Sequence, residues 1–101
     1  MRVVLLATPA EHAPRLARSL VEEGLAACVH VPAVGTSTYR WKGEVAVDEE
    51  VLMVLKCAAD RVDALRDRAL ALHPYELPAF VVLAVDESAT PASVLDWVAK
   101  G

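Results

Sequence analysis

Three segments of this sequence, residues 25–29, 51–55 and 80–85, are apolar at every position. Their length and composition predict buried strands. Because successive side chains of a strand point to opposite faces of its sheet, these strands present apolar residues on both faces. The chain must therefore fold into a sheet that is covered on both sides.

Turn and capping signals divide the chain into alternating strands and helices. The expected strands cover residues 3–7, 25–31, 36–41, 44–57 and 80–85. The helix-start signals are Thr8-Pro9 with Glu11, then Asp60, then Thr90-Pro91, and the helix-end signals are Gly24 and His73-Pro74. Pro32 interrupts the second strand with a bulge or bend, because proline has no N–H for the sheet.

The Lys42-Gly43 pair predicts a two-residue turn that joins two strands into a hairpin. The strand after it, residues 44–57, would be about 46 Å long at about 3.3 Å per residue. A domain of this size has a radius of gyration of about 13 Å. The hairpin must therefore bend or project beyond its own core, as arms that grip another subunit do.

The predicted order is β-α-β-β-α-β followed by a C-terminal helix, which indicates an α+β, ferredoxin-like antiparallel sheet with a long hairpin between its second and third strands. The 101 residues form one domain, residues 1–101. Helices of this fold cover one face of the sheet, and the C-terminal helix is too short to cover the other. We therefore expect copies of the chain to cover the second face.

Charge and cysteine content exclude several classes of protein. The net charge is −4 and no Lys/Arg cluster occurs, which disfavours a nucleic-acid partner. No segment approaches the roughly 18 apolar residues of a membrane span, and the apolar run 3–7 is too short for an export signal. The two cysteines lack metal-ligand or disulfide-framework spacing, so we expect a cytoplasmic protein.

Four motifs occur along the chain, namely Leu25-Ala26-Ala27-Cys28, Tyr39-Arg40-Trp41-Lys42-Gly43, Glu50 with Lys56, and Leu72-His73-Pro74-Tyr75-Glu76-Leu77-Pro78. Together they resemble the motifs of CutA, a family associated with divalent-cation tolerance. The resemblance implies a non-enzymatic homotrimer with interlocked hairpins and a kinship with PII signalling proteins, which bind ligands between subunits. It implies no obligatory cofactor, with copper or another divalent metal as a candidate ligand. Ala7 and Leu72 depart from the family pattern, because some members have potential metal ligands there.

His73 and Glu76 are the candidate metal ligands, because imidazole and carboxylate suit copper and zinc. The alternative is that His73 caps the end of the preceding helix. Tyr75, between them, is expected to be half-buried with a bonded hydroxyl.

Cys28 and Cys57 would face each other if the hairpin register ran unbroken from the Lys42-Gly43 turn, with His30 on the same face. That arrangement would make a thiol–imidazole site suited to Cu(I). The alternative is two buried cysteines that act as small apolar residues. A bulge at Pro32 would shift the register by one residue and separate them.

The remaining candidate residues lie on the hairpin and its long strand. Tyr39, Arg40 and Trp41 can line a ligand cleft between subunits or serve as contacts at an interface. Glu50 and Lys56 share one face of a strand and favour a salt bridge across subunits. The acidic run at residues 48–50 is typical of a solvated strand edge.

Two functions remain open from the sequence. The first is a cytoplasmic homotrimer for divalent-cation tolerance or response, which binds metal ions between subunits. The alternative is a PII-like sensor that binds a small metabolite in the same cleft. An enzyme is disfavoured, because no nucleophile, base and orienting residue occur at a recognisable spacing.

Overall fold

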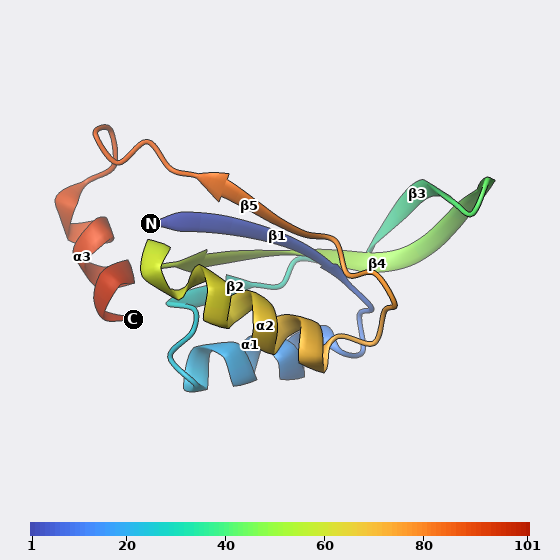
Figure 1. The fold of residues 1–101 in the computed structure, drawn as a ribbon, viewed down its shortest axis with the longest axis horizontal. Coiled ribbons are helices and arrows are strands. Elements are labelled where there is room, and N and C mark those ends of the chain that lie inside the picture. Colours follow the sequence, from blue (N-terminus) through green and yellow to red (C-terminus); the bar gives the residue numbers. More distant parts are fainter.

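An antiparallel sheet with helices on one face forms the body of the computed structural model, which describes residues 1–101 (Figure 1). The elements in order are β1 (Arg2–Thr8), α1 (Ala13–Glu22), β2 (Cys28–His30), β3 (Gly35–Trp41), β4 (Glu44–Cys57), a 3-10 turn (Ala59–Arg61), α2 (Val62–Leu72), β5 (Phe80–Ala84) and α3 (Ala92–Lys100). The sheet order is β2-β4-β1-β5, and β3 pairs with the outer part of β4. The expected α+β, ferredoxin-like arrangement with a C-terminal helix is confirmed.

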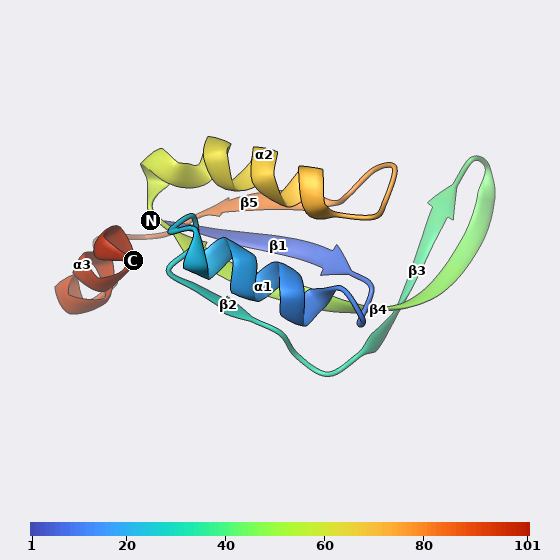
Figure 2. The ribbon, with the colours of Figure 1, turned by 90° about the horizontal axis from the view of Figure 1, so that it is seen from below.

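Helices α1 and α2 lie side by side on one face of the sheet (Figure 2). The core forms where their apolar stripes meet every second residue of β1 and β4, as strand alternation requires. Its largest fully buried apolar side chains include Val4, Leu6, Leu20, Met53, Leu55 and Leu65. This face of the sheet is closed within a single chain.

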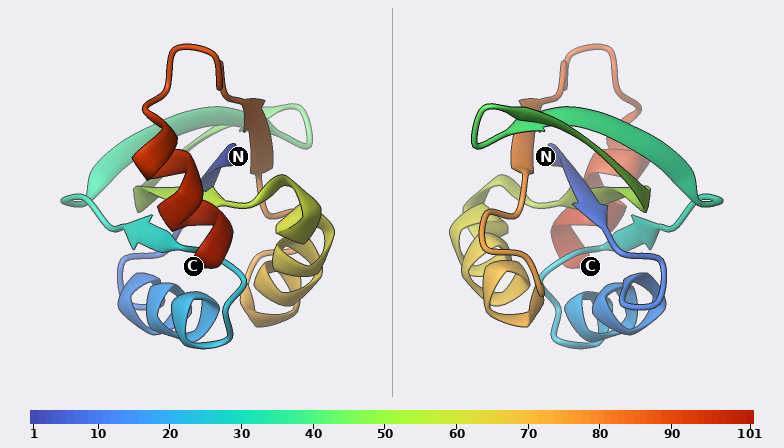
Figure 3. Two further views of the ribbon diagram at one scale, coloured as in Figure 1. Left: turned by 90° about the vertical axis from the view of Figure 1, so that its left-hand side faces the viewer. Right: turned by 90° about the vertical axis from the view of Figure 1, so that its right-hand side faces the viewer.

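The opposite face of the sheet, which we call the open face, is apolar and uncovered. Leu52 is 52% exposed, and Val81 and Leu83 on the edge strand β5 are 47% and 43% exposed. Helix α3 lies at the end of the sheet remote from the hairpin tip and leaves this face bare (Figures 1 and 3). The apolar second face predicted from the sequence is therefore present, and nothing within the chain covers it.

The hairpin of β3 and β4 projects beyond the body of the protein (Figure 2). Lys42 and Gly43 form its two-residue turn with φ values of 51° and 84°, so both residues are left-handed, as a type I′ turn requires. The molecule is 44 Å long against 27 Å and 24 Å in the other directions. The long, projecting arm is confirmed.

The predicted helix start at Thr8 is wrong by several residues, and the one at Asp60 is one residue too early. Thr8 is the buried last residue of β1, and its hydroxyl donates to the Leu6 carbonyl instead of capping a helix. Helix α1 begins only at Ala13, after a turn in which the Pro9 carbonyl accepts from two backbone N–H groups. Asp60 likewise lies within a 3-10 turn that precedes α2. Proline beside a capping residue also starts such turns, so the Thr8-Pro9 signal was placed one turn too early.

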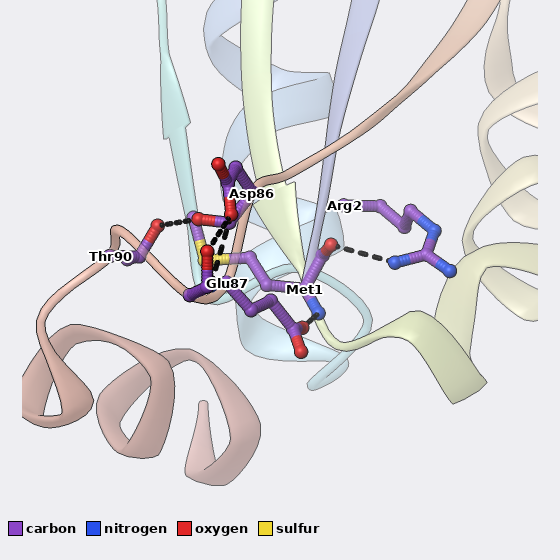
Figure 4. A network of polar contacts seen from close by, with 6 residues as sticks. Met1, Arg2, Asp86, Glu87 and Thr90 are labelled. Atoms are coloured by element: carbon purple, nitrogen blue, oxygen red, sulfur yellow. Dashed lines mark hydrogen bonds and ion pairs between the residues drawn. The ribbon is translucent and has the colours of Figure 1, made fainter.

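The segment between β5 and α3 is fixed by a small polar network (Figure 4). Thr90 donates its hydroxyl to the Asp86 carbonyl at 2.8 Å, and Glu87 forms an ion pair with the amino group of Met1. Because Met1 directly precedes β1, these contacts hold the start of α3 close to the sheet. They lie at the opposite end of the molecule from the hairpin.

Candidate functional site

A cavity of about 530 Å³ lies where the hairpin leaves the body of the protein. Strands β3 and β4 form one wall, and the loop between α2 and β5 forms the other. Its lining residues are Ala7, Ser37, Tyr39, Trp41, Glu50, Pro74, Tyr75, Glu76, Leu77 and Ala79. The volume falls within the range of about 300–1,000 Å³ that is typical of small-molecule sites.

Glu50 and Tyr75 form the polar centre of this cavity. Glu50 lies on the open-face side of β4, is only 9% exposed, and accepts a hydrogen bond of 2.8 Å from the Tyr75 hydroxyl. Burial and this bond to a carboxylate raise the pKa of Tyr75. The phenol therefore remains a neutral donor, and it fixes the position of the carboxylate.

Tyr39 and Trp41 line the cavity from the hairpin. The Tyr39 hydroxyl donates to the Asp48 carboxylate across the hairpin, and this bond raises the pKa of Tyr39. The Lys42 ammonium lies 5.7 Å from the centroid of the Trp41 ring, within cation–π distance. The cavity thus combines aromatic rings with carboxylates.

His73 lies behind the cavity wall and is only 7% exposed. Its Nε2–H donates to the Ala7 carbonyl at 2.8 Å, and its Nδ1 accepts from the Tyr75 N–H at 3.1 Å. The ring also packs edge-on against the Tyr75 ring, with centroids 4.7 Å apart. His73 therefore joins the end of α2 to the end of β1, and both of its nitrogens are occupied by backbone groups.

The residues do not form a metal centre within one chain. Glu76 lines the cavity, as a ligand could, but His73 has no free nitrogen, and no group of three His, Cys, Asp or Glu side chains is placed to hold an ion. His73 is the C-cap residue of α2, yet its ring bonds to β1 and its own loop instead of the helix carbonyls. The helix ends there as predicted, but the ring does not cap it.

The thiol–imidazole site proposed for Cys28, Cys57 and His30 is wrong. Cys28 lies opposite Lys56 in the β2–β4 pair, which is one residue away from the unbroken hairpin register. Cys57 faces the helices and is 1% exposed, whereas Cys28 and His30 lie on the other face. The interruption around Pro32 causes the shift, so the bulge alternative holds.

Arg40 and Lys56 are not brought to the cavity. Arg40 alternates with Tyr39 and Trp41 and points to the other side of the hairpin. Lys56 lies on the open face beside Cys28, six residues from Glu50, which is about 20 Å along a strand. The two cannot pair within one chain, so their predicted salt bridge across subunits stays a prediction.

Asp48 is the site residue that the sequence analysis missed. The acidic run was interpreted as a solvated edge, yet Asp48 accepts the Tyr39 hydroxyl. The hairpin register was sufficient to find it, because Tyr39 pairs with Ala46 and Asp48 with Ser37, so that Tyr39 and Asp48 are diagonal neighbours on one face. Ser37, which the sequence analysis also missed, shares that face and lines the cavity, whereas Asp48 lies outside the lining.

The raised pKa of Tyr75 predicts a pH effect that can be measured in a Tyr39→Phe variant, where Tyr75 is the sole tyrosine. In the folded variant, tyrosinate absorbance should appear only well above the ordinary pKa of 10.0, and in denaturant at that ordinary value. Above pH 10.0 only the unfolded state would lose this proton, so stability should be complete below that pH and fall above it. Identical titrations of the folded and unfolded protein would contradict the buried Glu50–Tyr75 pair.

Comparison with known proteins identifies the family of this chain. Residues 2–101 match the family described as CutA1 divalent ion tolerance protein. The chain belongs to this family. It is 43% identical over 97 residues to the divalent-cation tolerance protein CutA of Thermus thermophilus, and the aligned region covers 95% of this chain and 92% of that protein.

Solved CutA structures have the same fold. The PII-like protein CutA from Nostoc sp. PCC 7120 in apo form superposes with a TM-score of 0.94 at 42% identity, covering 98% of this chain and 94% of that one. Human Protein CutA is 42% identical over 86 residues, but the chain spans only 47% of its length. The recognised family and its PII-like fold are confirmed.

Location differs among the CutA relatives. A CutA from Archaeoglobus fulgidus, 28% identical with a TM-score of 0.89 and covering 97% of this chain and 94% of that one, is described as periplasmic. The rice relative, 37% identical over 84 residues and matched across 48% of its length, is described as chloroplastic. In this chain, none of the helices has the length and hydropathy that a bilayer crossing requires.

Proposed function

We propose that this chain acts as a cytoplasmic homotrimer in divalent-cation tolerance, copper included, and that cations bind where subunits meet. The observation that carries this proposal is the open face, on which Leu52, Val81 and Leu83 are each more than two-fifths exposed. Exposed apolar patches mark protein–protein contacts, and most soluble oligomers are formed by identical chains. The open face is therefore expected to pack against other copies of this chain. The projecting hairpin would reach across to a neighbouring subunit.

The cation component of the proposal places the ion between subunits because one chain lacks a complete set of ligands. Glu76 is exposed at the cavity rim and would supply one carboxylate. His73 would join only if its ring exchanged a backbone partner for the ion. Copper and zinc accept such mixed nitrogen and oxygen ligands.

One experiment tests both parts. Analytical ultracentrifugation of the purified chain at micromolar concentration, alone and with Cu(II) or Zn(II), should give a trimer in each case and comigrating metal in the second. Glu76→Gln should bind the metal at least about tenfold more weakly, while Glu49→Gln, which removes an exposed carboxylate from β4, should bind it normally. A monomer would count against the proposed trimer. Equal metal affinity of the Glu76→Gln and Glu49→Gln variants would count against the proposed cation site.

A second candidate function is a PII-like sensor that binds a small metabolite. The specific observation in its favour is the 530 Å³ cavity with its fixed Glu50–Tyr75 pair. Single, scattered glycines supply no phosphate cradle, which disfavours nucleotides as its ligand.

A further inference from the structure

We propose that the cavity between the hairpin and the α2–β5 loop binds a small organic cation of the tertiary or quaternary ammonium class. The inference rests on the second candidate function, a metabolite cleft, and names the chemistry of its ligand. Four observations carry it, namely the charge of the lining, the state of Glu50, the aromatic rings and the lack of a metal-ligand set.

The lining of the cavity is negative. Glu50 and Glu76 are its charged residues, and no Lys, Arg or His is among the ten that line it. Asp48 adds a third carboxylate just behind Tyr39, whose hydroxyl it accepts. A cleft lined by one sign of charge concentrates ligands of the opposite sign, so the lining favours a cation over an anionic metabolite.

The carboxylate of Glu50 is nearly buried and incompletely paired. Tyr75 donates to Oε2 at 2.8 Å, and no other donor in the chain reaches either oxygen. Glu50 is only 9% exposed, and its Oε1 has no donor within the chain. A positive charge placed in the cavity beside Oε1 would form an ion pair with this carboxylate.

Aromatic rings supply the rest of the site. Tyr39, Trp41 and Tyr75 all line the cavity, and their faces attract cations. The Lys42 ammonium lies 5.7 Å from the Trp41 centroid, so this ring already attracts a cation within the chain. Aromatic side chains beside a carboxylate are the residue types that recognise alkylated ammonium groups.

The same residues suit an organic cation better than a metal ion. No three His, Cys, Asp or Glu side chains converge, whereas small inorganic cations need several such ligands. An alkylated ammonium holds its water weakly and gains from apolar contact with Pro74, Leu77 and Ala79. The cavity volume accommodates a molecule of this size with room for a substituent.

Choline and its uncharged isostere 3,3-dimethylbutan-1-ol test the inference directly. In a Trp97→Phe background, Trp41 is the sole tryptophan, and its fluorescence reports on the cavity. Choline should change this emission saturably, and the isostere should bind at least about tenfold more weakly because it lacks the charge. Equal binding of the two, or no binding of choline, would overturn the proposal.

Two variants define the contribution of the carboxylate. Glu50→Gln keeps an acceptor for Tyr75 but removes the charge, and it should weaken choline binding at least about tenfold. Glu49→Gln removes the same charge from the adjacent exposed position on β4, and it should change the affinity less than about threefold. Similar losses in both variants would mean that general negative charge, and not the cavity, attracts choline.

A lysine from a neighbouring copy is the competing occupant. Lys56 lies on the open face without an ionic partner in its own chain, and its ammonium could enter the cavity of another subunit. Choline binding by Lys56→Met alone, and not by the parent protein, would identify this lysine as the occupant and overturn the ligand proposal. Oligomeric state is measured on the same samples, so absent choline binding by an intact trimer refutes this inference and leaves the trimer standing.

Discussion

Leu52→Asp is expected to convert the proposed trimer into monomers. Leu52 lies near the centre of the open face and is 52% exposed in the single chain, so the change costs the isolated subunit little. In an assembly that covers this face, each copy would bury a carboxylate without a partner, at a cost of several kcal/mol. Since about 1.4 kcal/mol corresponds to a tenfold change, association should weaken at least about 100-fold. Sedimentation at micromolar concentration measures this directly.

The control for this prediction is Leu70→Asp. Leu70 is 40% exposed on the outer surface of α2, so the same chemical change is made on the layer of helices. That variant should sediment as the parent protein does. A trimer formed by Leu52→Asp would mean that the open face is not the contact between subunits, and the cleft proposals that depend on this contact would need a different geometry.

Most strand positions were predicted well, because burial on both faces leaves a signal in the sequence, but the expected strand 25–31 forms only the three residues of β2. Residues 44–57 were expected as one strand and form β4 with those bounds. The Lys42-Gly43 turn was found because a two-residue hairpin turn requires positive φ values, which few residue pairs other than those with glycine adopt readily. The start of α1 was predicted poorly, because Thr8 can satisfy a backbone group at a strand end as well as in a cap.

The candidate site was predicted in part. Tyr39, Trp41, Glu50, Tyr75 and Glu76 do line one cavity, because hairpin alternation and a proline-bounded loop bring them together. Arg40, Lys56 and Cys28 were grouped with them by motif, but strand parity and distance along β4 separate them. The role of His73 depends on a contact with Ala7, 66 residues away, which no local pattern reports.

His73→Ala is expected to lower the free energy of unfolding by about 2–4 kcal/mol. The change removes a nearly buried ring and leaves the Ala7 carbonyl and the Tyr75 N–H without their partners. Each unsatisfied buried group costs about 1–3 kcal/mol, and the lost packing adds to this. Guanidinium unfolding at one fixed protein concentration measures the difference, because oligomer stability depends on concentration.

The same unfolding experiment separates a structural His73 from a metal ligand. His12→Ala, at the start of α1, removes a histidine whose side chain forms no hydrogen bond, and it should change stability by less than about 0.5 kcal/mol. Both variants are unfolded with a chelator and then with added Cu(II). If His73 joins α2 to β1 through its two backbone partners, its loss destabilises the protein equally in both conditions. A cost seen only with the metal would assign the ring to the ion and contradict the contacts with Ala7 and Tyr75.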